Sequence, residues 1–143
     1  MPTRTAKAAW EGGIKSGKGT LEVESGTLKA QYNFSGRFES GGGSNPEELL
    51  AASEAACFSM ALSGNLERNG TPATRIETSA ACTVDRAGDG FKITTMKLTV
   101  RATVPNIDDA KFQQVAEQTK KTCPISMAII GNVDLQMTAT LQS

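Results

Sequence analysis

The sequence predicts a mixed α/β fold of the α+β type, built from short strands, two long strands and helices. Apolar and polar residues alternate in several separate stretches, which is the period of a half-buried strand. Residues 49–62 are instead apolar or small on every face of a helix. Because 143 residues have room for one core only, we expect a single domain over residues 1–143.

The first part of the chain predicts an antiparallel meander of three strands. Ala6, Ala8 and Trp10 alternate with polar neighbours, and the same period returns at residues 21–23 and 28–34. Residues 35–44 are rich in glycine and predict a flexible loop, which carries Arg37.

The most informative segment is a predicted helix that begins after Asn45 and runs to about Arg68. Asn45 supplies an N-cap, and Pro46 suits the first helical position. Between residues 49 and 62 the only charged residue is Glu54. A helix that is apolar on every face is buried all round, and this one would be about 36 Å long at 1.5 Å per residue. A chain of this size can hardly cover it, so we expect a second copy to wrap part of it.

Two long strands follow this helix. Residues 76–84 and 91–104 alternate in period two on either side of a turn at residues 87–90. The phase slips by one residue at Thr94 and Thr95, which predicts a β-bulge.

The last third of the chain predicts two helices and a strand. Asn106 is expected to cap a helix whose C-terminal end carries two lysines. Cys123 and Pro124 break the chain there, and a short helix is expected from Pro124 to Ile130. Residues 133–141 alternate cleanly and predict the final strand.

Charge and residue usage exclude several functional classes. Lys plus Arg and Asp plus Glu are 15 each, so we expect no nucleic-acid partner. The absence of histidine excludes Ser-His-Asp and Cys-His catalysis and His-based metal sites. The three cysteines form no CxxC pair. No leader and no uninterrupted apolar run near the roughly 18 residues of a membrane span are seen, so we expect a cytoplasmic protein without a membrane partner.

Each candidate side chain has a structural as well as a chemical interpretation. Cys82 lies on the apolar face of a strand and is interpreted as a packing residue. Cys57 in the apolar helix is explained about equally well by core packing and by reactivity. Cys123 stands at a helix junction, where backbone donors and two preceding lysines favour a thiolate, but packing explains it equally. Arg37 fits a solvated loop charge, and Glu47 fits an acid in the first turn of a helix.

Several motifs occur in order along essentially the whole chain. They are Trp10-Glu11-Gly12, Gly17-Lys18-Gly19-Thr20, Arg37-Phe38-Glu39, Asn45-Pro46-Glu47-Glu48-Leu49-Leu50, Ala55-Ala56-Cys57-Phe58-Ser59-Met60-Ala61-Leu62 and Cys123-Pro124-Ile125-Ser126. In these motifs the chain resembles the family of osmotically inducible protein C and organic hydroperoxide resistance proteins (OsmC/Ohr), and Arg37 indicates the OsmC branch. The resemblance implies an OsmC-like fold, an intertwined homodimer in which two mainly antiparallel sheets enclose two central helices.

The same resemblance implies the activity and its residues. Members of the family resembling this chain are thiol peroxidases that reduce organic hydroperoxides and protect against oxidative stress. The peroxidatic cysteine of the family falls on Cys57, the resolving cysteine on Cys123, the arginine on Arg37 and the acid on Glu47. No metal, flavin or nucleotide is implied, and an external dithiol, such as a lipoylated protein, would restore the thiols.

Elementary physical chemistry supports these roles. A free thiol with a pKa near 8.5 is only about 3% thiolate at pH 7, and only the thiolate attacks a peroxide. A guanidinium about 4 Å away contributes about 4 kcal/mol at an effective dielectric constant of 20, enough to lower the pKa by about one to two units after desolvation. Glu47 would orient Arg37 through a bidentate pair. Because ten helical residues, about 15 Å, separate Glu47 from Cys57, we expect each site to combine the cysteines of one chain with the acid and arginine of the other.

An alternative interpretation belongs to another class. The chain could form a dimeric module that binds an apolar or thiol-bearing small molecule or senses redox state, without catalysis. Cys57 and Cys123 would then be packing or sensing residues. The presence of all four side chains, including Arg37 and Glu47, favours the peroxidase, because a binding module does not need the complete set.

Overall fold

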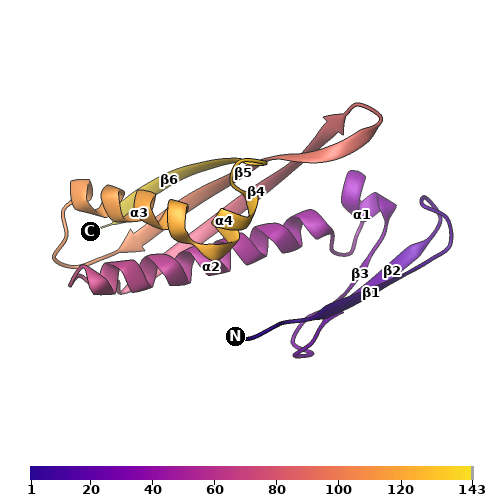
Figure 1. Cartoon of the computed structure of the whole chain (residues 1–143). Coiled ribbons are helices and arrows are strands. Elements are labelled where there is room, and N and C mark those ends of the chain that lie inside the picture. Colours follow the sequence, from indigo (N-terminus) through magenta and orange to yellow (C-terminus); the bar gives the residue numbers. More distant parts are fainter. Residues whose placement is uncertain (143) are drawn as a thin grey trace. The chain divides into compact units, whose positions relative to one another are not determined.

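The structure is a computed structural model and describes residues 1–142 (Figure 1). The chain divides into two compact units, residues 1–49 and the part from residue 50 onward. The elements in chain order are β1 (Ala6–Glu11), β2 (Lys18–Val23), β3 (Lys29–Tyr32), α1 (Phe34–Phe38), α2 (Pro46–Arg68), β4 (Arg75–Ala87), β5 (Gly90–Thr103), α3 (Asp109–Thr122), α4 (Pro124–Ile129) and β6 (Asp134–Gln142).

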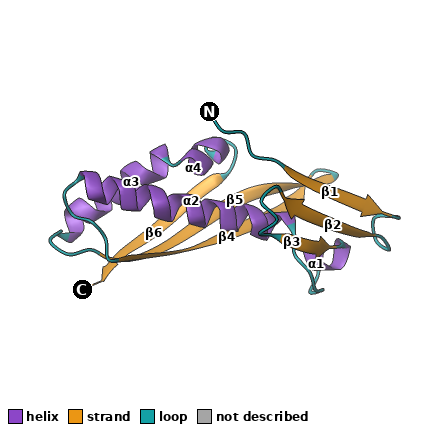
Figure 2. Ribbon diagram, turned by 90° about the horizontal axis from the view of Figure 1, so that it is seen from below, coloured by secondary structure: helices purple, strands orange, loops and turns teal. Residues whose placement is uncertain are grey.

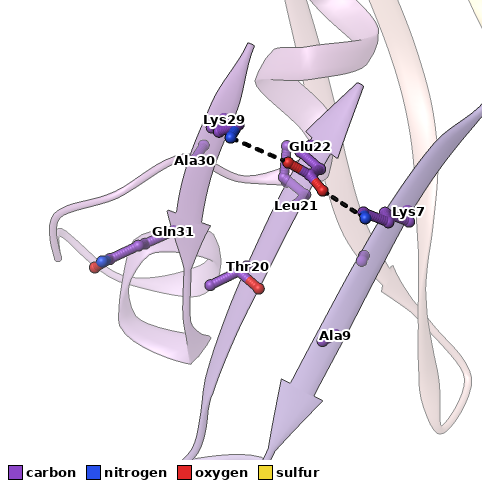
Figure 3. A pocket seen from close by; sticks show the side chains of 9 residues that line it. Lys7, Ala9, Thr20, Leu21, Glu22, Lys29, Ala30 and Gln31 are labelled. Carbon is purple, nitrogen blue, oxygen red and sulfur yellow. Dashed lines mark ion pairs between the residues drawn. The ribbon is translucent and has the colours of Figure 1, made fainter. Parts of the chain in front are cut away.

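The N-terminal unit contains the predicted antiparallel meander, with the strands in the order β1, β2, β3. Lys7, Glu22 and Lys29 stand opposite one another across the three strands. The Glu22 carboxylate lies 2.7 Å from Nζ of Lys7 and 3.4 Å from Nζ of Lys29 (Figure 3). These three residues belong to the lining of an open pocket on the sheet, and that lining contains no cysteine.

Residues 34–38 form the short helix α1, where the sequence predicted the end of a strand followed by a flexible loop. The side chain of Asn33 accepts a hydrogen bond of 2.7 Å from the backbone N–H of Gly36 and so caps the helix. Such a local bond lets an asparagine compete with strand pairing. Arg37 is therefore carried on a helical turn and not on a loop.

The second unit is built on a three-stranded sheet in the order β4, β5, β6. The β4–β5 pair is antiparallel, and β6 runs parallel to β5. Thr83 stands opposite Thr95 and Val84 opposite Ile93, so that Thr94 is the extra residue of a bulge. The bulge predicted from the phase slip is thus confirmed.

The core of the second unit lies between this sheet and the helices α2, α3 and α4, which cover one face of the sheet (Figures 1 and 2). Period-two alternation along β5 turns every second side chain toward the helices. The fully buried large side chains of this core include Phe58, Leu62, Leu66, Met96, Leu98, Val100 and Phe112.

The helix α3 is capped by Asp108, so the predicted cap at Asn106 is wrong. The Asp108 side chain accepts a hydrogen bond of 2.8 Å from the backbone N–H of Lys111. Asn106 instead adopts a left-handed backbone conformation with φ of 65° in the preceding turn, a conformation that asparagine tolerates better than most residues. The short helix predicted after Cys123 is confirmed as α4.

The long helix α2 is confirmed, but the single chain does not bury it on every side. Its exposed stripe is formed by Ala52, Ala56, Met60 and Ser63, and Met60 is 81% exposed. Among residues 1–142, α2 is the one helix that is long and apolar enough to cross a membrane, with a mean hydropathy of 1.2 in an 18-residue window. This window average tolerates the charged Glu54, which interrupts the apolar run of α2. Core helices of soluble proteins reach the same value.

Candidate active site

Two cysteines of the second unit lie in contact. Cys57 is half-buried in the middle of α2, and Cys123 is fully buried at the junction of α3 and α4. Their Sγ atoms are 3.1 Å apart. A disulfide has an S–S bond of about 2.05 Å, so a displacement of about 1 Å would join the two sulfurs.

The local sequence explains the position of Cys123. Its backbone N–H donates to the carbonyl of Thr119, which closes the last turn of α3, and its own carbonyl accepts from Met127 in α4. Pro124 occupies the first position of α4. Proline has no N–H and cannot continue a helix, so the chain turns here and the Cys123 side chain meets α2.

The surroundings of Cys57 raise the pKa of its thiol. Burial is the largest cause, because it withdraws water from the thiolate, and the contact with Cys123 acts in the same direction. Glu54, when it is ionised, also raises this pKa, whereas the backbone of Ile125 lowers it. Among residues 1–142, no cationic side chain contributes to this shift of the Cys57 pKa. The thiol pair by itself therefore favours the protonated form of Cys57.

Arg37 and Glu47 meet within the N-terminal unit. The guanidinium donates from Nε to both carboxylate oxygens, at 3.1 and 3.2 Å, and from Nη2 to Oε1 at 2.8 Å. Glu47 is only 6% exposed. The side-chain amide of Asn45 donates to the carbonyl of Gly36 at 3.2 Å and links α1 to the start of α2. The predicted contact between Arg37 and Glu47 is confirmed as a bidentate pair.

The structure thus brings the four predicted side chains together as two pairs, each within its own compact unit. Cys57 meets Cys123, and Arg37 meets Glu47. Cys82 faces Met96 across β4 and β5 and packs against the core, which supports its interpretation as a packing residue. Among residues 1–142, no group of three or more Cys, Asp or Glu side chains is placed to hold a metal ion.

One pair beside the thiols has no counterpart in the predictions from sequence. Glu54 is completely buried, and Ser126 Oγ donates a hydrogen bond to its Oε1. The other carboxylate oxygen, Oε2, has no partner in the described structure. The available signal was that Glu54 is the only charge in an otherwise apolar stretch, but the sequence did not reveal the hydroxyl that it meets.

The fold and the thiol pair together define a dithiol redox protein on a mixed α/β scaffold. Residues 39–138 match the model of the OsmC-like protein family. The chain belongs to the OsmC family, and the expected mixed α/β chain fold with two three-stranded sheets is confirmed.

Similar proteins extend over nearly the whole chain. Peroxiredoxin OsmC of Escherichia coli is 44% identical over 92% of this chain and 93% of its own length. The organic hydroperoxide resistance protein OhrB of Bacillus subtilis is 32% identical over 93% of this chain and 92% of its own. A crystal structure of an organic hydroperoxide resistance protein OsmC from Legionella pneumophila has a TM-score of 0.71 at 26% identity and covers 95% of this chain and 96% of that one. The higher identity to OsmC than to OhrB agrees with the predicted branch.

Proposed function

We propose that this protein is a cysteine-based peroxidase that reduces organic hydroperoxides to alcohols and protects the cell against oxidative stress. The observation that carries the proposal is the 3.1 Å contact between the sulfurs of Cys57 and Cys123. Relatives named peroxiredoxin and organic hydroperoxide resistance protein support the same activity. The proposed setting is the reducing cytoplasm, where such a disulfide forms only transiently.

The reaction proceeds in three steps. The Cys57 thiolate attacks one peroxide oxygen; an S–O bond forms, the O–O bond breaks, and the alkoxide leaves as the alcohol after taking up a proton. Cys57 is now a sulfenic acid. Cys123 gives up its thiol proton and attacks this sulfur, so that an S–S bond forms and the hydroxyl leaves as water. An external dithiol, such as a lipoylated protein, then reduces the disulfide by exchange.

The first step needs a cation, because the second unit raises the pKa of Cys57. Arg37 is suited to this task, since a guanidinium keeps its charge and can donate to the peroxide as well. Glu47 holds the guanidinium in a fixed orientation. We therefore propose that each active site uses the cysteines of one chain and the Arg37–Glu47 pair of a second copy.

The homodimer that this requires is supported by the exposed stripe of α2. The residues of that stripe are small or apolar, and Met60 at its centre is 81% exposed. Large apolar side chains left in water are unusual when they adjoin further apolar surface. A second copy would cover the stripe, and residues 1–143 would act as one OsmC-like domain within the dimer.

The surface beside the thiols favours a substrate with a hydrocarbon group. Met60 lies one turn after Cys57 in α2, and Met127 lies one turn after Cys123 in α4. Both are exposed in the single chain, at 81% and 59%. Flexible, polarizable methionines adapt to apolar ligands of different shape, so these side chains favour an alkyl hydroperoxide over hydrogen peroxide.

Consumption of cumene hydroperoxide with dithiothreitol as reductant tests the assignment. Cys57→Ser is expected to abolish turnover. When dithiothreitol is left out, Cys123→Ser is expected to cleave one equivalent of peroxide and to accumulate the sulfenic acid. Cys82→Ser is the matched control and should retain the wild-type rate. Full turnover in Cys57→Ser would contradict the proposal and favour the binding or sensing module.

A further inference from the structure

Two contacts join α2 to α4, and they lie next to each other. Cys57 meets Cys123, and Glu54 meets Ser126. Glu54 precedes Cys57 by three residues, whereas Ser126 follows Cys123 by three residues, so α2 and α4 run past each other in opposite directions. Residues three apart on a helix are neighbours on its surface. The carboxyl–hydroxyl pair is therefore the next contact along the same helix–helix seam as the thiol pair.

The short helix α4 is attached to the core through two half-buried isoleucines, Ile125 and Ile129, and through one buried polar contact. Of its six residues only Ser126 is buried. Its hydroxyl donates to Glu54, which is completely buried as well. A helix of this length is not stable by itself, so a buried hydrogen bond at its centre is well placed to fix its position against α2.

The state of Glu54 follows from its surroundings. Burial raises the pKa of its carboxyl, and the hydrogen bond from Ser126 lowers it by a smaller amount. The titratable groups at this seam are the thiols of Cys57 and Cys123, and Cys82 lies on the core side of β4. A buried carboxylate with an unpartnered oxygen would be costly. The neutral acid avoids this cost and places no negative charge beside the thiol that must ionise.

We propose that Glu54 and Ser126 are positioning residues of the redox centre. Glu54, as a neutral acid, accepts the Ser126 hydrogen bond and holds α4 against α2, which keeps Cys123 within reach of Cys57. This positioning assists disulfide closure. In that step the S–S bond forms, and the hydroxyl of the Cys57 sulfenic acid leaves as water with the proton of Cys123. The inference rests on the proposed function for the origin of that sulfenic acid.

The experiment separates peroxide cleavage from closure in the full-length protein. Reduced protein is mixed with one equivalent of cumene hydroperoxide and quenched with dimedone, which traps the sulfenic acid, at increasing times. Ser126→Ala and Glu54→Ala should form the sulfenic acid within about threefold of the wild-type rate but close the disulfide about tenfold more slowly, the effect of one lost hydrogen bond. Glu54→Gln keeps the acceptor without a charge and should close at nearly the wild-type rate.

Two variants serve as matched controls on the same helix. Ser59→Ala removes a hydroxyl that donates to Oγ1 of Thr78 at 2.8 Å, a bond from α2 to the sheet and not to α4. Glu67→Gln makes the same chemical change as Glu54→Gln at an exposed position. Both should close the disulfide at the wild-type rate.

A second measurement tests the inference without peroxide. Equilibration with a glutathione redox buffer gives the effective concentration of the two thiols, which should fall about tenfold in Ser126→Ala. If Ser126→Ala changes neither the rate of disulfide closure nor the effective concentration of the thiols, the inference is wrong. If Glu54→Gln closes the disulfide as slowly as Glu54→Ala, Glu54 does not act as a neutral acid. A wild-type protein that forms no sulfenic acid would instead contradict the proposed function, and the glutathione equilibrium would still decide the role of Ser126. Ser126→Ala removes a single oxygen, so it carries the test if Glu54→Ala fails to fold.

Discussion

The two compact units differ in how they are held together. All the buried apolar side chains lie in the second unit, between Phe58 and Leu135. In residues 1–49 only Gly19 and Glu47 are buried. Burial of apolar surface is the main force in folding, and a three-stranded sheet needs an apolar face packed on something else. The second unit thus has a core of its own, whereas residues 1–49, which carry Arg37, bury no large apolar side chain.

This difference connects reactivity to assembly. The thiols lie in the unit with its own core, where burial raises the pKa of Cys57. The cation that would lower that pKa lies in the unit that lacks a core. In the proposed shared site, a chain without its partner would therefore favour the protonated thiol of Cys57.

The largest expected effect is that of Arg37→Ala. We expect the reaction with cumene hydroperoxide at pH 7 to slow by about 100-fold, because both the thiolate fraction and a donor to the peroxide are lost. The pH profile should change as well: the variant's rate should keep rising above the pH at which the wild-type rate levels off, since its Cys57 ionises only at the raised pKa. Stopped-flow rates between pH 5 and pH 10 (roughly the range that spans thiol ionisation) check this. Identical pH profiles in the wild type and Arg37→Ala would show that Arg37 does not influence the ionisation of Cys57.

Truncation of one leucine in each unit compares their packing. Leu62→Ala removes a completely buried side chain from the core of the second unit and should cost about 2–5 kcal/mol of unfolding free energy. Leu21→Ala changes a half-buried side chain in β2, and its cost should be smaller. If the proposed dimer covers β2, this cost should depend on protein concentration. Urea unfolding at two protein concentrations measures both. An equal, concentration-independent loss in the two variants would remove the contrast.

A smaller effect is expected in the pH dependence of stability. The native pKa of Glu54 is raised above its ordinary value of 4.5, so between that value and the raised pKa the folded state binds more protons than the unfolded state. Wild-type stability therefore falls as the pH rises through this window, by at most about 1.4 kcal/mol per pH unit for one group. Glu54→Gln has no proton to lose and should gain on the wild type above pH 4.5. If the unfolding free energies of the wild type and Glu54→Gln ran parallel with pH, folding would not change the pKa of the Glu54 carboxyl.

The smallest effect is expected for Glu22→Gln in the N-terminal sheet. This change removes both contacts to Lys7 and Lys29, but exposed ion pairs are screened by water and salt. The thermal unfolding midpoint should stay within experimental error at physiological salt. A clear loss of stability would show that these pairs, and not a covering surface, hold the unit together.

Much of the fold could be predicted because local rules determine it. The N-cap at Asn45 with Pro46 marks the start of α2, and period-two alternation marks the strands of both sheets. The bulge at Thr94 follows from a slip of that period. These features depend on residues that are close together in the sequence, so the local pattern of a single sequence is enough to predict them.

Other features depended on competition or on distance. Asn33 caps α1 in a stretch where period-two alternation predicted a strand. Asp108 caps α3, although Asn106 precedes it in the loop and was the predicted cap. The contact of Glu54 with Ser126 joins residues 72 positions apart, and no pattern in the sequence links an acid to that serine. The thiol and ion pairs were expected from the motifs that carry the family resemblance, since spacing alone does not bring Cys57 to Cys123.

The most direct test of a shared active site is complementation between two inactive chains. Arg37→Ala and Cys57→Ser proteins are co-expressed so that mixed dimers form, and cumene hydroperoxide reduction is compared with that of each variant alone. If the arginine of one chain serves the cysteines of the other, each mixed dimer has one complete site, and a random mixture should regain about a quarter of the wild-type activity. If Arg37 served the cysteines of its own chain, no mixed dimer would hold a complete site and activity would stay at the level of the separate variants.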